Sequence, residues 1–237
     1  MDQPIDYTEH DLNRAFTALH AKKPYEIKSL GGAIITLKDK VFVPDSLVFG
    51  LANFGSQFLA EHHEVRAVAD LGTGSGVLAV SLAKLYPHKK FSAFDISPAA
   101  IGLAKENARI NQLHNLKVVM SRPHEWVPSA YREPVDLIIS NPPFIGRDEW
   151  NDPQLFKNFP DGKYQPKQAM KTGDRYGFSA YIAIVETALH RKVRWVIFRA
   201  NGAYSDMLIE KLRPYAAKLT THMSNACPII VLELPAA

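Results

Sequence analysis

Residues 65–76 read VRAVADLGTGSG, an apolar run that ends in an aspartate and a glycine-rich turn. The first half is typical of a buried strand, and the apolar residues from 75 to 86 predict the helix that follows it. The three glycines allow the backbone to turn sharply and to come close to a ligand. Their spacing is G-x-G-x-G, not the G-x-G-x-x-G of dinucleotide-binding turns, so the turn alone identifies no cofactor.

The same alternation of strand and helix continues downstream. Strands are predicted at 90–95, 116–120, 135–140, 193–198 and 228–234, and helices at 97–110, 177–190 and 204–216. Ser97 is the predicted N-cap of the helix at 97–110, and Pro98 occupies its first turn. Such alternation indicates an α/β fold with a parallel sheet covered on both faces. Ligands of these sheets bind beyond the carboxyl ends of the strands, so functional residues are expected there.

Upstream of residue 65 the pattern is different. A helix signal covers 8–19, a β-rich stretch with a Gly31-Gly32 turn covers 25–44, and a helix capped by Asp45 or Ser46 is predicted at 45–62. We therefore expect three parts: a short helical segment at 1–24, a β-hairpin linker at 25–48 and one main α/β domain at 49–237.

Composition narrows the class of protein. The 237 residues are 46% hydrophobic, which is ordinary for a globular chain, and no window resembles a membrane span, so no membrane partner is expected. The single cysteine, Cys227, excludes an internal disulfide and favours a cytoplasmic location. A net charge of +4 and a pI of about 9.0 permit a nucleic-acid partner without requiring one. No cluster of ligands indicates a metal site.

Two aspartates follow the first two strands of the alternating region. Asp70 precedes the glycine turn, where a carboxylate would bind a cationic amine and repel a pyrophosphate. Asp95 ends the strand at 90–95, and an acidic residue at the end of a second strand is where a ribose diol is held. Ser97 is better placed than Asp95 to cap the next helix, which leaves Asp95 for the ribose.

A third strand end reads Asn141-Pro142-Pro143-Phe144. The two prolines fix φ and donate no backbone hydrogen bonds, so they hold Asn141 and the nearby carbonyls rigidly. The Asn141 amide oxygen and a proline carbonyl can both accept from one NH₂ group, and Phe144 offers a flat face to a planar substrate. These groups suit an amide or an exocyclic base nitrogen, a weak nucleophile that gains more from orientation than from a strong base.

Together the three strand ends predict a cationic, ribose-containing cofactor beside a clamp for a weakly nucleophilic nitrogen. S-adenosylmethionine meets this description. Its methionyl amine would bind Asp70, its ribose would bind Asp95, and its sulfonium methyl would face Asn141.

The stretches DLGTGSG, FDISPAAIGLAKENA and VDLIISNPPFIG resemble the class I S-adenosylmethionine-dependent methyltransferases, in particular the HemK-like release-factor glutamine methyltransferases. The likeness runs from about residue 25 to residue 237. It implies a Rossmann-like, mostly parallel seven-stranded sheet and N-methylation of a glutamine side chain or a related acceptor. It also implies the site residues. The cofactor residues would be Asp70, Gly72, Thr73, Gly74, Ser75, Gly76, Asp95, Ile96, Ser121, Arg122 and Asn141, and the catalytic residues Asn141, Pro142, Pro143 and Phe144.

The chain departs from the family pattern at several positions. Phe144 stands where the family usually has Tyr, Ser121 and Arg122 stand where an acidic residue commonly meets the adenine, and Arg199 and Asn201 replace an E-x-G-like ending. About 24 residues precede the hairpin, where a release-factor enzyme carries a helical bundle. The sequence therefore leaves three classes of methyl acceptor: a protein, an RNA or DNA base (adenine N6 or guanine N2) and a small metabolite. A non-catalytic protein that retains the cofactor pocket is a further alternative.

The connection from about 145 to 176 is long, and loops of this length are usually functional or disordered. Because it follows the clamp directly, we predict a substrate lid lined by Trp150, Phe156 and Tyr164. Asp148 and Glu149 are interpreted as a solvated charge cluster.

Overall fold

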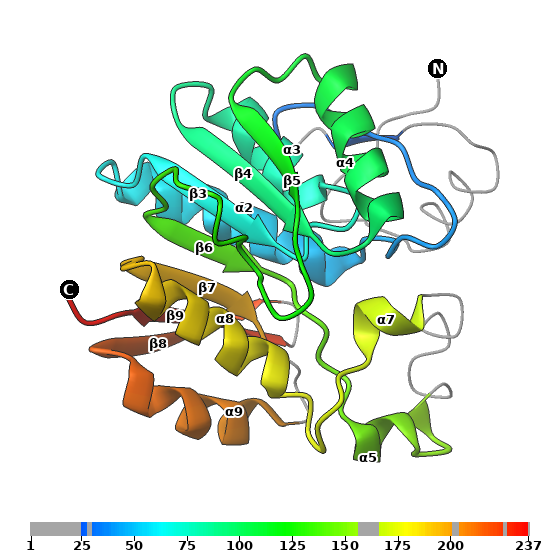
Figure 1. Ribbon diagram of the computed structural model, residues 1–237, viewed down its shortest axis with the longest axis vertical. Coiled ribbons are helices and arrows are strands. Elements are labelled where there is room, and N and C mark those ends of the chain that lie inside the picture. The colour runs from blue at the N-terminus through cyan, green and yellow to red at the C-terminus, as the bar shows by residue number, and fades with distance from the viewer. Residues whose placement is uncertain (1–24, 28–29, 156–165, 201–203, 225–226, 237) are drawn as a thin grey trace.

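The structure is a computed structural model that describes residues 25–27, 30–155, 166–200, 204–224 and 227–236. Its main feature is a seven-stranded sheet in the order β5-β4-β3-β6-β7-β9-β8 (Figure 1). The strands are β3 (Ala67–Leu71), β4 (Lys90–Asp95), β5 (Leu116–Met120), β6 (Leu137–Ser140), β7 (Trp195–Arg199), β8 (Lys218–Ser224) and β9 (Cys227–Glu233). The first five of these run parallel, and β9 is antiparallel to both β7 and β8. The predicted Rossmann-like fold is confirmed.

Helices cover both faces of this sheet. The helices are α2 (Ser46–Glu61), α3 (Val77–Leu85), α4 (Pro98–Ile110), α5 (Arg147–Trp150), α7 (Lys167–Met170), α8 (Ser179–His190) and α9 (Ser205–Leu212). Along β3, Val68 is buried in a cluster with α2 and α3, whereas Ala69 and Leu71 are buried in a second cluster with α8 and α9. Successive strand residues point to opposite faces, so this alternation separates the two halves of the core.

The helix at 97–110 follows its prediction closely. Pro98 begins α4, and the Ser97 hydroxyl accepts a hydrogen bond from the Ala100 amide, as an N-cap does. Asp45, one of the two candidates named for the earlier helix, is the N-cap of α2 and accepts from the Leu47 and Val48 amides.

Strand β8 has no counterpart among the strands predicted from sequence pattern. It lies at the edge of the sheet and pairs only with β9 among the described strands. Its sequence, KLTTHMS, carries polar residues because an edge strand stays partly solvated, so it lacks the continuous apolar run of the central strands. The helix predicted at 204–216 is shorter than expected, because α9 ends at Leu212 and continues as a 3₁₀ turn over Arg213–Tyr215.

The β-rich stretch forms two short antiparallel strands, β1 (Tyr25–Ile27) and β2 (Ala33–Ile35). Gly31 and Gly32, which lie between the two strands, both have positive φ. The Ala33 and Ile35 side chains are buried in the cluster formed with α2 and α3. Asn107 of α4 fastens this region, because it accepts from the Thr36 amide and donates to the Thr36 and Ser75 carbonyls. The division into 1–24, 25–48 and 49–237 stays a prediction, and the helix expected at 8–19 lies outside the described residues.

Within the part of the chain that the structure describes, no helix combines the length and the apolar character that crossing a membrane requires.

Candidate active site

The three predicted strand ends are tied together by hydrogen bonds at one edge of the sheet. The Gly72 and Thr73 amides both donate to the Phe94 carbonyl at 2.9 Å, which joins the glycine turn to β4. The Gly74 amide donates to Asp95 Oδ2 at 2.9 Å. Ser140 Oγ donates to the Leu71 carbonyl at 2.6 Å, which joins the end of β6 to the same turn. The turn, Asp95 and the Asn141 loop therefore lie next to one another at this edge.

Glycine is required at the last position of the turn. Gly76 has a φ of +82° and is the N-cap of α3. A Cβ built there would lie 3.1 Å from the Ala104 Cβ and 3.2 Å from the Ala104 Cα of α4. A side chain at this position would strain the backbone and push α4 away, so Gly76 sets how closely α3 and α4 pack behind the turn.

Asp70 is buried beneath the turn with half of its carboxyl group unused. Its Oδ2 accepts from Thr73 Oγ1 at 2.6 Å, whereas its Oδ1 has no hydrogen-bond partner among the described residues. Burial raises the pKa of Asp70 to about 7, and the Thr73 hydrogen bond opposes this rise. A buried carboxyl group with a free oxygen is matched to a cationic donor such as an amino group. Ser75, also buried, has a hydroxyl without a partner among the described residues.

Asp95 ends β4 and uses both oxygens to organise the neighbouring loop. Oδ2 accepts from Gly74, and Oδ1 accepts from the Ser97 amide at 2.8 Å. Burial raises the pKa of Asp95. Ile96, which follows directly, leaves 58% of its surface exposed, which is unusual for a large apolar side chain at a strand end. It offers an uncovered apolar surface beside the carboxylate.

Ser121 and Arg122 stand at the end of β5 and differ in their surroundings. Ser121 is buried, its amide donates to the Asp95 carbonyl at 2.8 Å, and its hydroxyl donates to the Trp126 carbonyl at 2.7 Å. Arg122 is exposed, and its backbone forms a bridge with Glu125. Trp126 itself lies near Gly72, 3.6 Å from the position a Cβ would take there. Sequence analysis did not single out this tryptophan.

The Asn141-Pro142-Pro143-Phe144 loop is held by the last residue of α7 and by the segment that follows this helix. The Phe144 and Ile145 amides donate to the Met170 carbonyl at 3.0 and 2.9 Å. Pro142 is buried, whereas Asn141, Pro143 and Phe144 are half-buried. Gly177 passes so close that a Cβ there would meet the Phe144 carbonyl oxygen at 2.0 Å. The loop is therefore fixed by backbone contacts as well as by its two prolines.

A residue with no role assigned from the sequence completes this loop. Arg199, the last residue of β7, is 6% exposed, and its Nη1 donates to Asn141 Oδ1 at 3.1 Å. Its Cζ lies 4.7 Å from the Phe144 ring centroid, over the ring. Asp45 Oδ2 lies 3.9 Å from the guanidinium. The available signal was a basic residue closing the apolar run WVIF, because a charge at the end of a buried strand needs a specific partner.

The remaining sequence candidates lie around or away from this site. Trp150 of α5 has Lys167 and Lys171 over its ring, each 5.4 Å from the centroid, while Phe156 and Tyr164 lie outside the described residues. Asp148 pairs with Arg175 at 2.5 Å, and both side chains are exposed. No group of three or more His, Cys, Asp or Glu in the described ranges is arranged to hold a metal ion.

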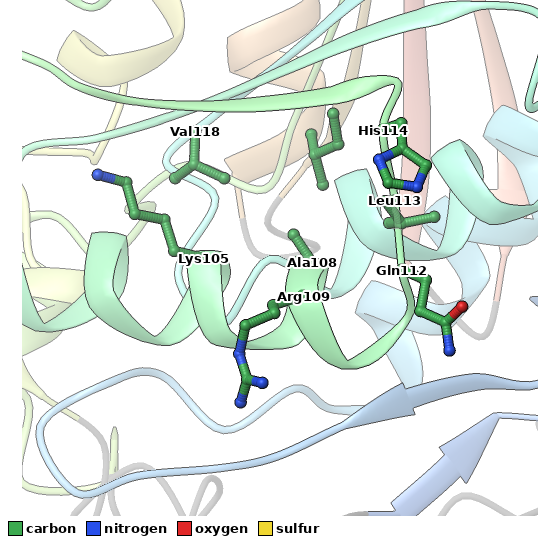
Figure 2. Close-up of a pocket in the computed structure, with 8 residues that line it drawn as sticks. Lys105, Ala108, Arg109, Gln112, Leu113, His114 and Val118 are labelled. Atoms are coloured by element: carbon green, nitrogen blue, oxygen red, sulfur yellow. The ribbon is translucent and has the colours of Figure 1, made fainter.

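A hollow of about 520 Å³ lies between α4 and β5, away from the carboxyl ends of the strands. Figure 2 shows Val118 of β5 and Ala108 of α4 within it, whereas Arg109 points away from β5. Lys105, Arg109 and His114 are among its lining residues.

The fold is Rossmann-like, and the residues at its strand ends fit a cationic cofactor. The family model for the methyltransferase small domain matches residues 40–159, which is just over half of the chain. The chain therefore belongs to the methyltransferase small domain family. S-adenosylmethionine is the methyl donor that this family implies, and the free oxygen of buried Asp70 and the exposed Ile96 fit that cofactor.

The comparisons with single proteins agree with this class. A release factor glutamine methyltransferase of Xylella fastidiosa (strain 9a5c) is 38% identical over 113 residues, which are 48% of this chain and 38% of that protein. The chain thus spans less than two thirds of the length of the curated relatives it matches.

Two human structures share the fold. The hMettl16 catalytic domain in complex with MAT2A 3′UTR hairpin 1 has a TM-score of 0.66 at 16% identity, covering 99% of this chain and 95% of that one. The N-terminal domain of human METTL16 in complex with SAH has a TM-score of 0.58 at 17% identity, covering 82% and 73%.

Proposed function

We propose that this methyltransferase methylates the nitrogen of a primary carboxamide, the side chain of a glutamine in a protein. The observation that carries the proposal is the clamp at the end of β6, where Arg199 holds Asn141 Oδ1 at 3.1 Å and lies over the Phe144 ring at 4.7 Å. The 38% identity to a release factor glutamine methyltransferase supports the same acceptor.

The cofactor roles follow the strand ends. Asp70 would bind the methionyl amine through its unused Oδ1, and the backbone of the turn from Gly72 to Gly76 would approach the cofactor closely. Thr73 would keep Asp70 in place through its hydrogen bond. Asp95 would accept from the ribose hydroxyls with the lone pairs that Gly74 and Ser97 leave free.

The adenine would lie against a mixed surface. Ile96 would pack on its face, and buried Ser121 would border its edge, with Arg122 at the exposed rim.

The acceptor roles belong to the clamp. Asn141 Oδ1 and the Pro142 carbonyl would accept from the two N–H groups of the acceptor, with Pro143 keeping the loop rigid and Phe144 supporting the planar group. When bound, S-adenosylmethionine supplies a methyl group on a cationic sulfur, and its transfer leaves the neutral thioether while the acceptor nitrogen loses one proton. These residues orient a weak nucleophile, and this positioning would accelerate methyl transfer.

A second candidate acceptor is an exocyclic nitrogen of an RNA or DNA base. It is favoured by the exposed basic side chains Lys105 and Arg109 on α4, which lie away from the clamp and would contact phosphates of a longer nucleic acid. An enzyme of this kind would stack a flipped base on Phe144, and its binding would weaken steeply with salt.

The test is transfer of label from methyl-labelled S-adenosylmethionine into a fractionated lysate, with protease and RNase controls. Protease-sensitive label that appears as N-methylglutamine after complete enzymatic digestion supports the proposal. RNase-sensitive label would show instead that the acceptor is an RNA base. Label in the small-molecule fraction would show that the acceptor is a metabolite.

Asn141→Ala and Gln57→Ala serve as matched variants in that assay. Gln57 is exposed on α2, outside the predicted lid, so its truncation is expected to leave transfer unchanged. Asn141→Ala should lower transfer about 100-fold while S-adenosylhomocysteine affinity stays within about three-fold. Equal activity of the two variants would show that Asn141 does not position the acceptor.

A further inference from the structure

Arg199 is a buried cation whose hydrogen bonds are incomplete. Only 6% of its surface is exposed, and its Nε has no hydrogen-bond partner among the described residues. Asp45 stands 3.9 Å from its Nη1, beyond hydrogen-bond distance, and Asp45 Oδ1 is already engaged by the Leu47 and Val48 amides. A buried charged donor without a partner destabilises a fold, so its presence beside a binding clamp indicates that a ligand atom completes it.

The neighbouring groups define what that ligand offers. Arg199 Nη1 donates to Asn141 Oδ1 at 3.1 Å, which leaves Nη1 a second N–H and Oδ1 a second lone pair side by side. A group with an oxygen next to an N–H complements both, and a primary carboxamide has this arrangement. A simple amine has no oxygen for Arg199 and would add a positive charge beside a buried cation.

We propose that Arg199 determines acceptor specificity by donating to the carbonyl oxygen of the acceptor carboxamide, while Asn141 accepts from its nitrogen. This assignment rests on the proposed carboxamide N-methylation. It places a substrate-reading residue on β7, in addition to the clamp on β6.

The amino edge of adenine also has an N–H beside an acceptor atom, but two observations favour the carboxamide. A guanidinium forms its strongest hydrogen bonds with oxygen, whereas adenine offers a ring nitrogen. Arg199 Cζ also lies 4.7 Å from the Phe144 centroid, so the guanidinium already covers one face of that ring. A carboxamide needs less of the ring surface than a purine does.

The test measures binding to protein saturated with S-adenosylhomocysteine, by ligand-detected NMR titration. The probes are N-acetylglutamine methylamide, N-acetylornithine methylamide and adenosine. Ornithine replaces the carbonyl carbon of glutamine by a methylene group and so lacks the oxygen that Arg199 is proposed to bind. The glutamine probe is expected to bind at least about ten-fold more tightly than either of the others.

Arg199→Met and Arg194→Met form a matched pair on the same strand region. Arg194 is an exposed arginine paired with Glu233 at 2.7 Å, and its substitution should leave the affinity for all three probes unchanged. Arg199→Met should weaken binding of the glutamine probe about ten-fold and abolish the preference over ornithine, with S-adenosylhomocysteine affinity within about two-fold. Arg199→Lys, which keeps the charge, covers the case in which Arg199→Met does not fold, and should show a smaller preference than the wild type.

Equal binding of the glutamine probe by the wild type and an Arg199 variant that retains S-adenosylhomocysteine would overturn the assignment. Tighter binding of adenosine than of the glutamine probe would overturn it in favour of a base. Methyl transfer to the glutamine probe, measured separately, distinguishes the two claims. Binding that depends on Arg199 without transfer defeats the proposed function alone, and transfer that is indifferent to Arg199 defeats the specificity assignment alone.

Discussion

The carboxylate of Asp45 lies 3.9 Å from the guanidinium of Arg199, and both side chains are buried. Asp45 is also the N-cap of α2, so one residue both starts a helix and supplies the countercharge of Arg199. Through Arg199 Nη1 and Asn141 Oδ1, this connection extends from the start of α2 across the end of β7 to the loop after β6.

The countercharge role can be separated from the capping role by Asp45→Asn. Asparagine caps helices as well as aspartate does, so the cap survives while the charge is lost. Leaving Arg199 without its carboxylate should lower the free energy of unfolding by about 3 kcal/mol, measured by urea titration. Asp206→Asn, an exposed acidic residue in the first turn of α9, is the control and should change stability by less than about 0.5 kcal/mol. A loss at Asp45 no larger than that at Asp206 would mean that the 3.9 Å pair contributes nothing.

Gly177 and Gly173 provide a matched pair that tests how the clamp loop is held. A Cβ at Gly177 would meet the Phe144 carbonyl oxygen at 2.0 Å, and its φ is +87°, whereas Gly173 has nothing within 4 Å. Gly177→Ala should therefore lower the free energy of unfolding by more than about 2 kcal/mol. Methyl transfer should fall at least about ten-fold, because the Phe144 loop is displaced. Gly173→Ala should leave both quantities near the wild-type values, and a similar loss in both variants would show that the contact with Phe144 does not matter.

Burial of Asp70 gives the cofactor-free protein a distinctive pH dependence. Because its pKa rises from 3.8 to about 7 in the folded state, the stability it contributes is full below about pH 4 and is lost as the pH rises through 7. Between pH 5 and pH 8 the free energy of unfolding should fall by about 2–3 kcal/mol relative to Asp70→Asn. Denaturant titrations of both proteins at the two pH values measure the difference.

The affinity for the cofactor should depend on pH in the opposite direction to the stability of the free protein. If the amine of S-adenosylhomocysteine pairs with the ionised form of Asp70, as proposed, the affinity of the wild type should rise as the pH increases from 5 to 8. Asp70→Asn should bind more weakly at pH 8 and show little pH dependence, as measured by calorimetry. A wild-type affinity that is flat over this range would contradict the assignment of Asp70 to the amine.

The parts of the site that could be predicted are those that follow a single strand. The glycine turn, Asp95 and the Asn141 loop each stand directly after an apolar run, and a parallel sheet brings such ends to one edge. The Asp45–Arg199 contact could not be predicted in this way, because it depends on β7 lying beside β6 and on where α2 begins. Strand β8 was not predicted, for a different reason. Its edge position leaves polar residues in the strand, so its pattern resembles that of a loop.

Ile96 offers a test of the cofactor site that is free of effects on folding. Since 58% of its surface is exposed, truncation to alanine removes little buried area and should change the free energy of unfolding by less than about 0.5 kcal/mol. If the side chain packs on the adenine, Ile96→Ala should weaken S-adenosylhomocysteine binding about five-fold to ten-fold, because the apolar contact is made only in the complex. Met207→Ala is the control, since Met207 is 48% exposed on α9. Calorimetry on the two variants decides the point: equal affinities would mean that Ile96 is exposed for a reason unrelated to the cofactor, and a loss confined to Ile96→Ala would place the adenine beside Asp95.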